Sequence, residues 1–238
     1  MALWVGQFGM EGGEARETTS WVGAYPDPGR AEEPSDLYVL VTPALPGSEE
    51  FCGEMKDVIG QSYHRHKLSL TGGMLQALRG AHQNLRDWNQ KSLPDHKVAA
   101  GVSCLAVQGG RAYTAQVAPA RAVFFRRGEL MTIEPDLAEA REPLGLEDDF
   151  RPDFRRFDLE AGDRILMLTP ALADGISDDD LADALSRTGE DALPQLYRRA
   201  QGAGDCGALL IIVTDDPAPA EPATDANPAS DASPASDK

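Results

Sequence analysis

The sequence predicts an α+β fold in which helices cover antiparallel β-sheets. Two observations lead to this prediction. Strand-like runs come in blocks, separated by pairs of helix-like segments, instead of alternating one by one with helices. In addition, Gly109 and Gly110 stand between two strand-like runs, as the turn of a hairpin does.

The first half of the chain is expected to form three strands and then two helices. Residues 3–9 and 21–25 have strand character, and the Gly- and Glu-rich stretch between them is expected to form a loop. Residues 37–41 are a continuous apolar run, which is typical of a strand buried on both faces. Apolar residues then recur at helical spacing in residues 49–59 and 68–90.

The second half of the chain returns to strands and ends with two helices and one more strand. Four strands are expected in residues 98–107, 111–117, 121–125 and 129–133. Residues 135–156 have mixed charge and weak periodicity, and we assign them mostly to a loop. A strand at residues 165–168 precedes helices that begin near Ser177 and Ala192, and residues 206–213 form the last buried strand.

Composition separates a folded domain from an acidic tail. The chain has 238 residues, with 39 acidic and 22 basic side chains, and its formal net charge is −17. Nucleic acids and anionic membranes are recognised through basic surfaces, so we exclude both as the main partner. We predict one domain in residues 1–214. Residues 215–238 are rich in Pro, Ala and Asp and are expected to be a disordered tail.

The cysteines and the hydropathy pattern indicate a cytoplasmic protein. Cys52, Cys104 and Cys206 are far apart and odd in number, so we expect free thiols instead of a disulfide framework or a zinc site. The N-terminus lacks the features of a signal peptide. No apolar stretch approaches the ~20 residues that a membrane-spanning helix requires. A membrane tether beyond the tail stays open if the natural chain is longer.

Three of the predicted strands end at a proline followed by an alanine. The three segments are Thr42-Pro43-Ala44, Ala118-Pro119-Ala120 and Thr169-Pro170-Ala171. Proline has no N–H group and cannot continue a central strand of a sheet. We therefore expect three strand ends that face one place.

The order and spacing of these segments resemble the metal-dependent Ser/Thr phosphatases of the PPM, or type-2C, family, over about residues 4–213. Four segments carry the resemblance: residues 42–47 at the place of Asp-Gly-Met-Gly-Gly, residues 101–123 at the Gly-Thr-Thr hairpin ending in Gly-Asp-Ser-Arg-Ala-Tyr, residues 162–171 at the Gly-Asp strand ending in Ser-Asp-Gly, and residues 205–206 at Asp-Asn. The resemblance implies a PPM-like sandwich of two mainly antiparallel β-sheets flanked by helices.

The resemblance also implies what a phosphatase site would need. The family holds two Mg²⁺ or Mn²⁺ ions with aspartates at strand ends, and a bridging water attacks the phosphorus atom. Most corresponding positions here offer no side-chain oxygen: Pro43, Ala44, Pro119 and Pro170. Asp205 keeps a carboxylate, and Arg16 matches the phosphate-binding arginine. We therefore predict a degenerate metal site with no catalytic residues, no metal and no cofactor.

Other chemistry-bearing residues have simpler structural interpretations. His64 and His66 form an HxH pair without a third ligand, so we place them in a surface loop. The acidic residues 178–180 are expected at the start of a helix, where the helix dipole favours carboxylates. Asp205 is also compatible with a turn. Ser103 has no histidine and aspartate at a fixed geometry and is not assigned to a catalytic triad.

The sequence thus predicts a catalytically inactive phosphatase-like protein that acts as a signalling, scaffold or binding module. The family implies a protein partner, such as a Ser/Thr kinase or a phosphoprotein. Two alternatives stay open. One is a divergent, active phosphatase with a rearranged or single-metal site, built from Asp205 with Glu32, Asp36 or Asp174. The other is a small-molecule-binding module in the emptied cleft.

Overall fold

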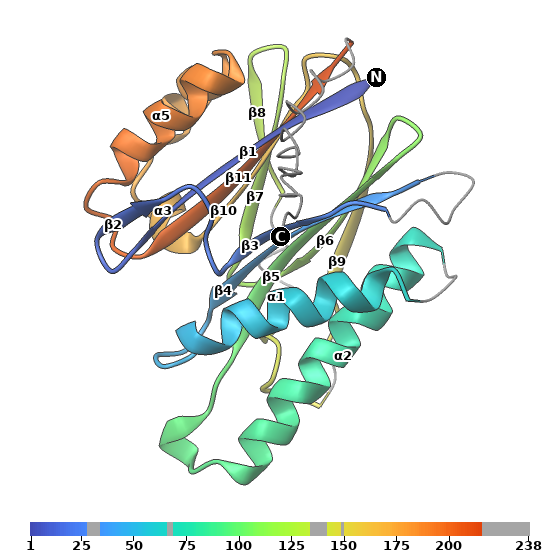
Figure 1. The fold of residues 1–238 in the computed structure, drawn as a ribbon, viewed down its shortest axis with the longest axis vertical. Helices are drawn as coiled ribbons and strands as arrows, with labels where there is room; N and C mark the ends of the chain where they lie inside the picture. Colours follow the sequence, from blue (N-terminus) through green and yellow to red (C-terminus); the bar gives the residue numbers. More distant parts are fainter. Residues whose placement is uncertain (28–33, 66–68, 134–141, 149, 216–238) are drawn as a thin grey trace, which may run out of the picture.

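The computed structural model describes residues 1–27, 34–65, 69–133, 142–148 and 150–215. Two β-sheets pack face to face, and helices cover both outer faces (Figure 1). Within these residues, all pairings between neighbouring strands are antiparallel. The predicted α+β sandwich is therefore confirmed. Of the predicted tail, residues 215–238, all but Asp215 lie outside the described residues.

The first sheet has six strands and the second has five. The first follows the order β2 (Glu14–Arg16), β1 (Ala2–Glu11), β11 (Cys206–Thr214), β10 (Arg164–Leu168), β7 (Arg121–Arg126) and β8 (Glu129–Ile133). The second follows the order β3 (Val22–Tyr25), β4 (Asp36–Pro43), β5 (Ala100–Gln108), β6 (Arg111–Val117) and β9 (Asp153–Asp158).

The helices form two separate layers. The outer face of the five-stranded sheet is covered by α1 (Glu49–Tyr63) and α2 (Leu70–Lys91), after which comes the short 3₁₀ helix η1 (Pro94–His96). The six-stranded sheet is covered by α3 (Pro170–Asp174), α4 (Asp178–Leu185) and α5 (Gly189–Ala200). No helix in the described part of the chain is long and apolar enough to cross a membrane.

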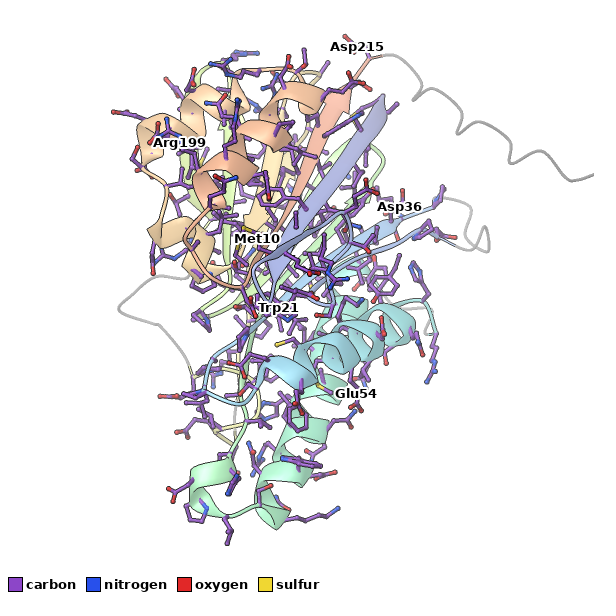
Figure 2. The ribbon with its side chains drawn as sticks, turned by 60° about the vertical axis from the view of Figure 1, so that its left-hand side comes forward. Met10, Trp21, Asp36, Glu54, Arg199 and Asp215 are labelled. Atoms are coloured by element: carbon purple, nitrogen blue, oxygen red, sulfur yellow. The ribbon has the colours of Figure 1, made fainter. Side chains whose placement is uncertain are left out.

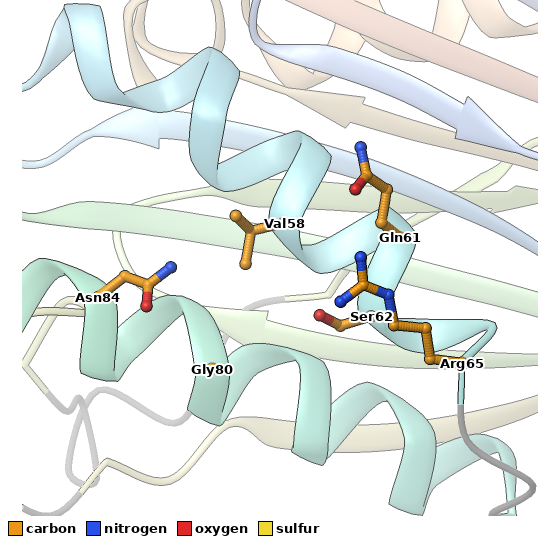
Figure 3. A pocket seen from close by; sticks show the side chains of 6 residues that line it. All are labelled: Val58, Gln61, Ser62, Arg65, Gly80 and Asn84. Carbon is orange, nitrogen blue, oxygen red and sulfur yellow. The ribbon is translucent and has the colours of Figure 1, made fainter.

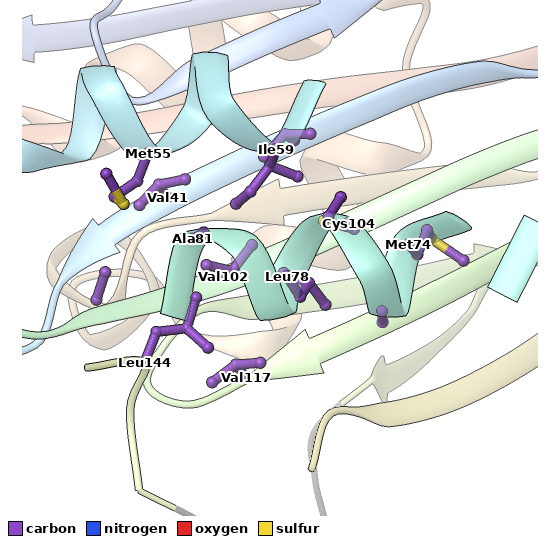
Figure 4. Packing of buried hydrophobic residues seen from close by; sticks show 14 of the residues in the cluster. Val41, Met55, Ile59, Met74, Leu78, Ala81, Val102, Cys104, Val117 and Leu144 are labelled. Carbon is purple, nitrogen blue, oxygen red and sulfur yellow. The ribbon is translucent and has the colours of Figure 1, made fainter. Parts of the chain in front are cut away.

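Three apolar layers result from this stacking, because the side chains of a strand alternate between its two faces. On β10, Ile165 packs between the sheets, whereas Leu166 packs under the helices of the six-stranded sheet. The helix pair α1–α2 closes the other outer layer, where Met55 and Leu78 are buried against the strands (Figure 4). The continuous apolar run at residues 165–168 is thus a strand buried on both faces, as predicted.

Two parts of the chain differ from the sequence prediction. The segment assigned mostly to a loop contains the strand β9, which lies at the edge of the five-stranded sheet and pairs with β6. This strand carries Arg155 and Arg156. An edge strand tolerates charged side chains because one of its sides faces solvent, so the apolar alternation is weak. The loop expected after β1 contains the short strand β2, which forms a hairpin with β1.

A buried carboxylate fixes the turn before β10. Asp163 is only 1% exposed and accepts hydrogen bonds from Arg126 Nε at 2.7 Å and Nη2 at 2.6 Å. The backbone N–H of Glu160 donates to the same carboxylate at 2.7 Å. Asp163 therefore joins β7, the turn and β10. The Gly-Asp pair that helped to suggest the phosphatase family has this structural role here.

The three cysteines are free and buried, as expected. Burial raises the pKa of the Cys104 thiol to about 12. Burial, followed by the charge of Glu49, raises the pKa of Cys52 to about 12 as well. Both thiols are therefore protonated at neutral pH and are poor nucleophiles.

Candidate functional site

The prolines at the ends of β6 and β10 lie at the same edge of the six-stranded sheet. Leu168, the last residue of β10, pairs with Arg121 at the start of β7 and with Ala208 near the start of β11. The turn that carries Pro119 leads directly into Arg121, and Pro170 follows β10 after one residue. The register of the sheet therefore brings these two segments together.

The end of β4 joins the same edge from the other sheet. Pro43 pairs with Ala100 at the start of β5, and the backbone N–H of Ala44 donates to the carbonyl of Ala99 at 2.9 Å. A Cβ atom at the neighbouring Gly101 would lie 2.5 Å from the ring of Pro119. The β6–β7 turn thus packs directly on β5, and strand ends of both sheets meet here. We call this region the strand-end edge; it comprises Pro43, Ala44, Pro119, Pro170 and Asp205.

Pro170 has a structural role that the sequence interpretation as a strand terminator did not include. It occupies the first turn of α3, where its missing N–H is not needed for a helical hydrogen bond. Just before it, the buried Thr169 donates its N–H to the carbonyl of Gly207 at 3.0 Å, and its Oγ1 accepts from the N–H of Gly207 at 3.2 Å. Pro170 therefore starts a short helix at this edge.

Asp205 binds a backbone group of a neighbouring hairpin. It precedes β11 and its Oδ1 accepts a hydrogen bond from the N–H of Gly12 at 2.7 Å. Gly12 lies in the turn between β1 and β2 and has a positive φ of 61°. This is a tertiary hydrogen bond, which the interpretation of Asp205 as a residue of a local turn did not include.

A second carboxylate near this edge was missed by the sequence analysis. Glu11 ends β1, and its Oε1 accepts hydrogen bonds from the N–H and the Oγ of Ser20, both at 2.8 Å. Next to Ser20, the indole of Trp21 is buried in the core. The sequence shows no sign of this contact because Glu11 and Ser20 are nine positions apart across a hairpin, and no periodic pattern marks such a pair.

The acidic residues considered for a rearranged metal site do not all lie near Asp205 and the strand-end edge. Asp174 lies at the end of α3 and forms an ion pair with Arg121 at 3.2 Å, so it lies next to the strand-end edge. Asp36 begins β4, whereas Pro43 ends it, and they are about 23 Å apart along the strand. Figure 2 shows Asp36 far from Met10, whose strand ends at the strand-end edge. Glu32 lies outside the described residues.

The remaining candidates have local partners or lie outside the described part. Arg16 lies on the exposed strand β2, and its Nη2 contacts the Glu14 carboxylate at 3.1 Å. His64 Nε2 lies 3.1 Å from the carbonyl oxygen of Tyr25, and His66 falls outside the described residues. At the start of α4, Ser177 accepts from the backbone N–H of Asp180 at 3.2 Å, which is the expected helix cap.

The donor atoms of the strand-end edge do not fit a pair of divalent cations. Mg²⁺ and Mn²⁺ require several oxygen ligands each, and four of the five positions of the edge have no side-chain oxygen. Oδ1 of Asp205 already accepts a hydrogen bond. Within the described residues, no group of three or more His, Cys, Asp or Glu side chains is placed to hold a metal ion.

Comparisons with known proteins identify the fold. No family profile matches the sequence, and no curated protein sequence matches it. Solved structures do match. The serine/threonine phosphatase of S. agalactiae aligns with 90% of this chain and 100% of its own length, with a TM-score of 0.71 and 16% identity. The chain has the PPM phosphatase fold.

Two further phosphatases agree with this assignment. The Mycobacterium tuberculosis phosphatase PstP/Ppp aligns with 90% of this chain and 100% of its own length, with a TM-score of 0.68 and 15% identity. Stp1 from Staphylococcus aureus aligns with 91% and 96%, with a TM-score of 0.71 and 13% identity. A structure of PstP is described as a complex with two manganese ions. These proteins thus share the PPM fold with this chain, and sequence identities this low show a common fold and nothing more.

Proposed function

We propose that this chain is a PPM-fold protein that does not hydrolyse phosphoesters through two metal ions and instead binds a protein partner. One observation carries the proposal: the strand ends that meet at the strand-end edge bear Pro43, Pro119 and Pro170, with Ala44 beside the first. A carboxylate at such a position would supply a metal-binding oxygen, whereas a proline ring supplies none.

The carboxylates that do lie at or near this edge support the proposal through their present contacts. Asp205 and Glu11 each hold a backbone N–H of a neighbouring loop, and Asp174 faces Arg121. If Asp205 turned toward a cation, Gly12 would lose its hydrogen bond, which contributes about 1 kcal/mol to stability. These side chains therefore stabilise loops, and no step of catalysis is assigned to them.

The names of the structures with the same fold support one kind of partner. These structures are named as serine/threonine phosphatases. We propose that this chain binds a Ser/Thr kinase or a phosphoprotein in the cytoplasm. The formal net charge of −17 supports a protein partner over a nucleic acid, because nucleic acids are bound through positive surfaces.

The test combines metal binding with catalysis. The full chain is titrated calorimetrically with Mn²⁺, and hydrolysis of p-nitrophenyl phosphate and of a phosphothreonine peptide is followed with and without Mn²⁺. We expect no binding of two ions and no metal-dependent turnover.

The opposite outcome would establish the divergent phosphatase. Mn²⁺-dependent hydrolysis that is lost in Asp205→Asn, but retained in the control Asp158→Asn, would overturn the proposal. Asp158 is a suitable control because it is exposed and lies on β9, with its carboxylate 3.6 Å from Arg111.

A further inference from the structure

The outer surface of the helix pair carries a pocket that lies away from the strand-end edge. It has a volume of about 280 Å³ and lies between α1 and α2 (Figure 3). Six residues line it: Val58, Gln61, Ser62, Arg65, Gly80 and Asn84. A Cβ atom at Gly80 would meet nothing within 4 Å, so there is open space on the α2 side of the pocket.

The polar groups of this pocket are suited to an anionic group. Arg65 is the cation among the lining residues, and no lining residue is acidic. In the described part of the chain, the side chains of Arg65, Gln61, Ser62 and Asn84 make no hydrogen bond and no ion pair, so their donors are available to a ligand. Figure 3 shows the Arg65 guanidinium next to Ser62, on the same side of the pocket as Gln61.

An aromatic pair, of a partly buried Phe51 and an exposed Trp88, lies farther along the same interhelical seam. Phe51 of α1 and Trp88 of α2 have ring centroids 4.9 Å apart, and Trp88 is 50% exposed. Trp88 follows Asn84 by one helical turn and Gly80 by two, so the indole lies about 6–12 Å beyond the pocket along α2. A single short segment can therefore reach both features.

A carboxylate on α1 favours one orientation of a segment bound to this surface. Glu54 lies between Phe51 and Val58 at helical spacing and is exposed. It repels an acidic group near the aromatic pair, while Arg65 attracts one at the other end. A bound segment thus places its acidic residue over the pocket and its apolar residue over Trp88.

We propose that the α1–α2 seam is a docking surface for a partner protein's segment that carries an acidic side chain and a large apolar side chain. The acidic side chain pairs with Arg65, just after the end of α1, and Phe51–Tyr63 spans about 18 Å at 1.5 Å per residue. In an extended segment each residue spans about 3.3 Å, so the two side chains are separated by about five or six positions. The inference rests on the proposed function, because it names the surface through which the protein partner is bound.

The experiment selects ligands without assuming a partner. The full chain is used to select binders from a displayed library of random dodecapeptides, and the affinity of enriched peptides is measured by isothermal titration calorimetry, which also reports binding to the Trp88 variant. We expect enriched peptides to carry Asp or Glu about five or six residues from Leu, Phe or Trp. Arg65→Gln should weaken their binding by about tenfold or more, because hydrogen bonds to charged groups are among the strongest. Trp88→Ala should also weaken it.

The control is Arg79→Gln, which removes an exposed arginine of α2 that does not line the pocket and should leave the affinity unchanged. An absence of enriched peptides overturns the inference, and so do peptides whose affinity survives both Arg65→Gln and Trp88→Ala. Self-association of the chain that Arg65→Gln abolishes also overturns it, because the occupant is then a second copy. Mn²⁺ titration of Arg65→Gln tests the proposed function separately, since the seam contributes nothing to the strand-end edge.

Discussion

Substitution of Asp205 separates a structural carboxylate from a metal ligand. Its Oδ1 accepts one hydrogen bond, from Gly12 at 2.7 Å, and the bond is exposed. Asp205→Ala removes this bond and should lower the free energy of unfolding by about 1 kcal/mol. For a domain of this size that corresponds to a decrease of about 2–4 °C in Tm. Asp205→Asn keeps the accepting oxygen and should lie within about 0.5 kcal/mol of the parent chain.

The assay is differential scanning calorimetry of the three chains in EDTA and in Mn²⁺. On our proposal Mn²⁺ shifts none of the midpoints. A metal ligand predicts a different pattern: at a hundredfold excess over Kd, bound Mn²⁺ would stabilise the parent chain by about 2.7 kcal/mol, or about 5–11 °C. Both variants would then lose that gain. An Mn²⁺-dependent stabilisation that disappears in Asp205→Asn therefore refutes the structural interpretation.

Three further predictions concern buried groups, and chemical denaturation checks the first two. Asp163→Asn replaces the charged acceptor of two hydrogen bonds from Arg126 and should lower the free energy of unfolding by about 2–4 kcal/mol, less than for a fully buried pair because the Arg126 side chain is 32% exposed. The control Asp158→Asn should lower it by under about 0.5 kcal/mol. Asn89→Ala leaves three buried backbone groups without their partner and should cost about 3 kcal/mol. The raised pKa of Cys104, about 12, keeps its thiol neutral in the folded chain, so its contribution to stability is complete below pH 9 and is lost as pH rises toward 12. Iodoacetamide at pH 8 should therefore label it only after unfolding.

The parts of the fold that sequence predicted well are those whose apolar pattern is set by burial alone. Residues 206–213 and 165–168 are apolar on both faces because each strand lies between a helix layer and the other sheet, and the structure has β11 and β10 there. The strand β9 was missed because Arg155 and Arg156 interrupt its apolar alternation. Such charges are tolerated only at a sheet edge, and which strand becomes an edge is decided by tertiary pairing.

The candidate site shows the same division between local and tertiary information. Pro43, Pro119 and Pro170 mark the ends of their strands in the sequence itself, and this local signal led to the prediction that the strand ends meet. The contact of Glu11 with Ser20 and that of Asp205 with Gly12 depend on how the β1–β2 hairpin folds back against β11. The separation of residues 12 and 205 is 193 positions, so no spacing in the sequence could indicate this contact.

On the proposed function, the packing at the strand-end edge closes this region without a metal. Clustered carboxylates repel one another unless a cation lies between them. Proline rings carry no charge, and the ring of Pro119 approaches Gly101 so closely that a Cβ at Gly101 would clash. Pro170 in turn begins α3, a position that suits its fixed φ. On the proposed function, the prolines are therefore part of a packed edge, and the open donors for a partner lie instead on the helical face at Arg65.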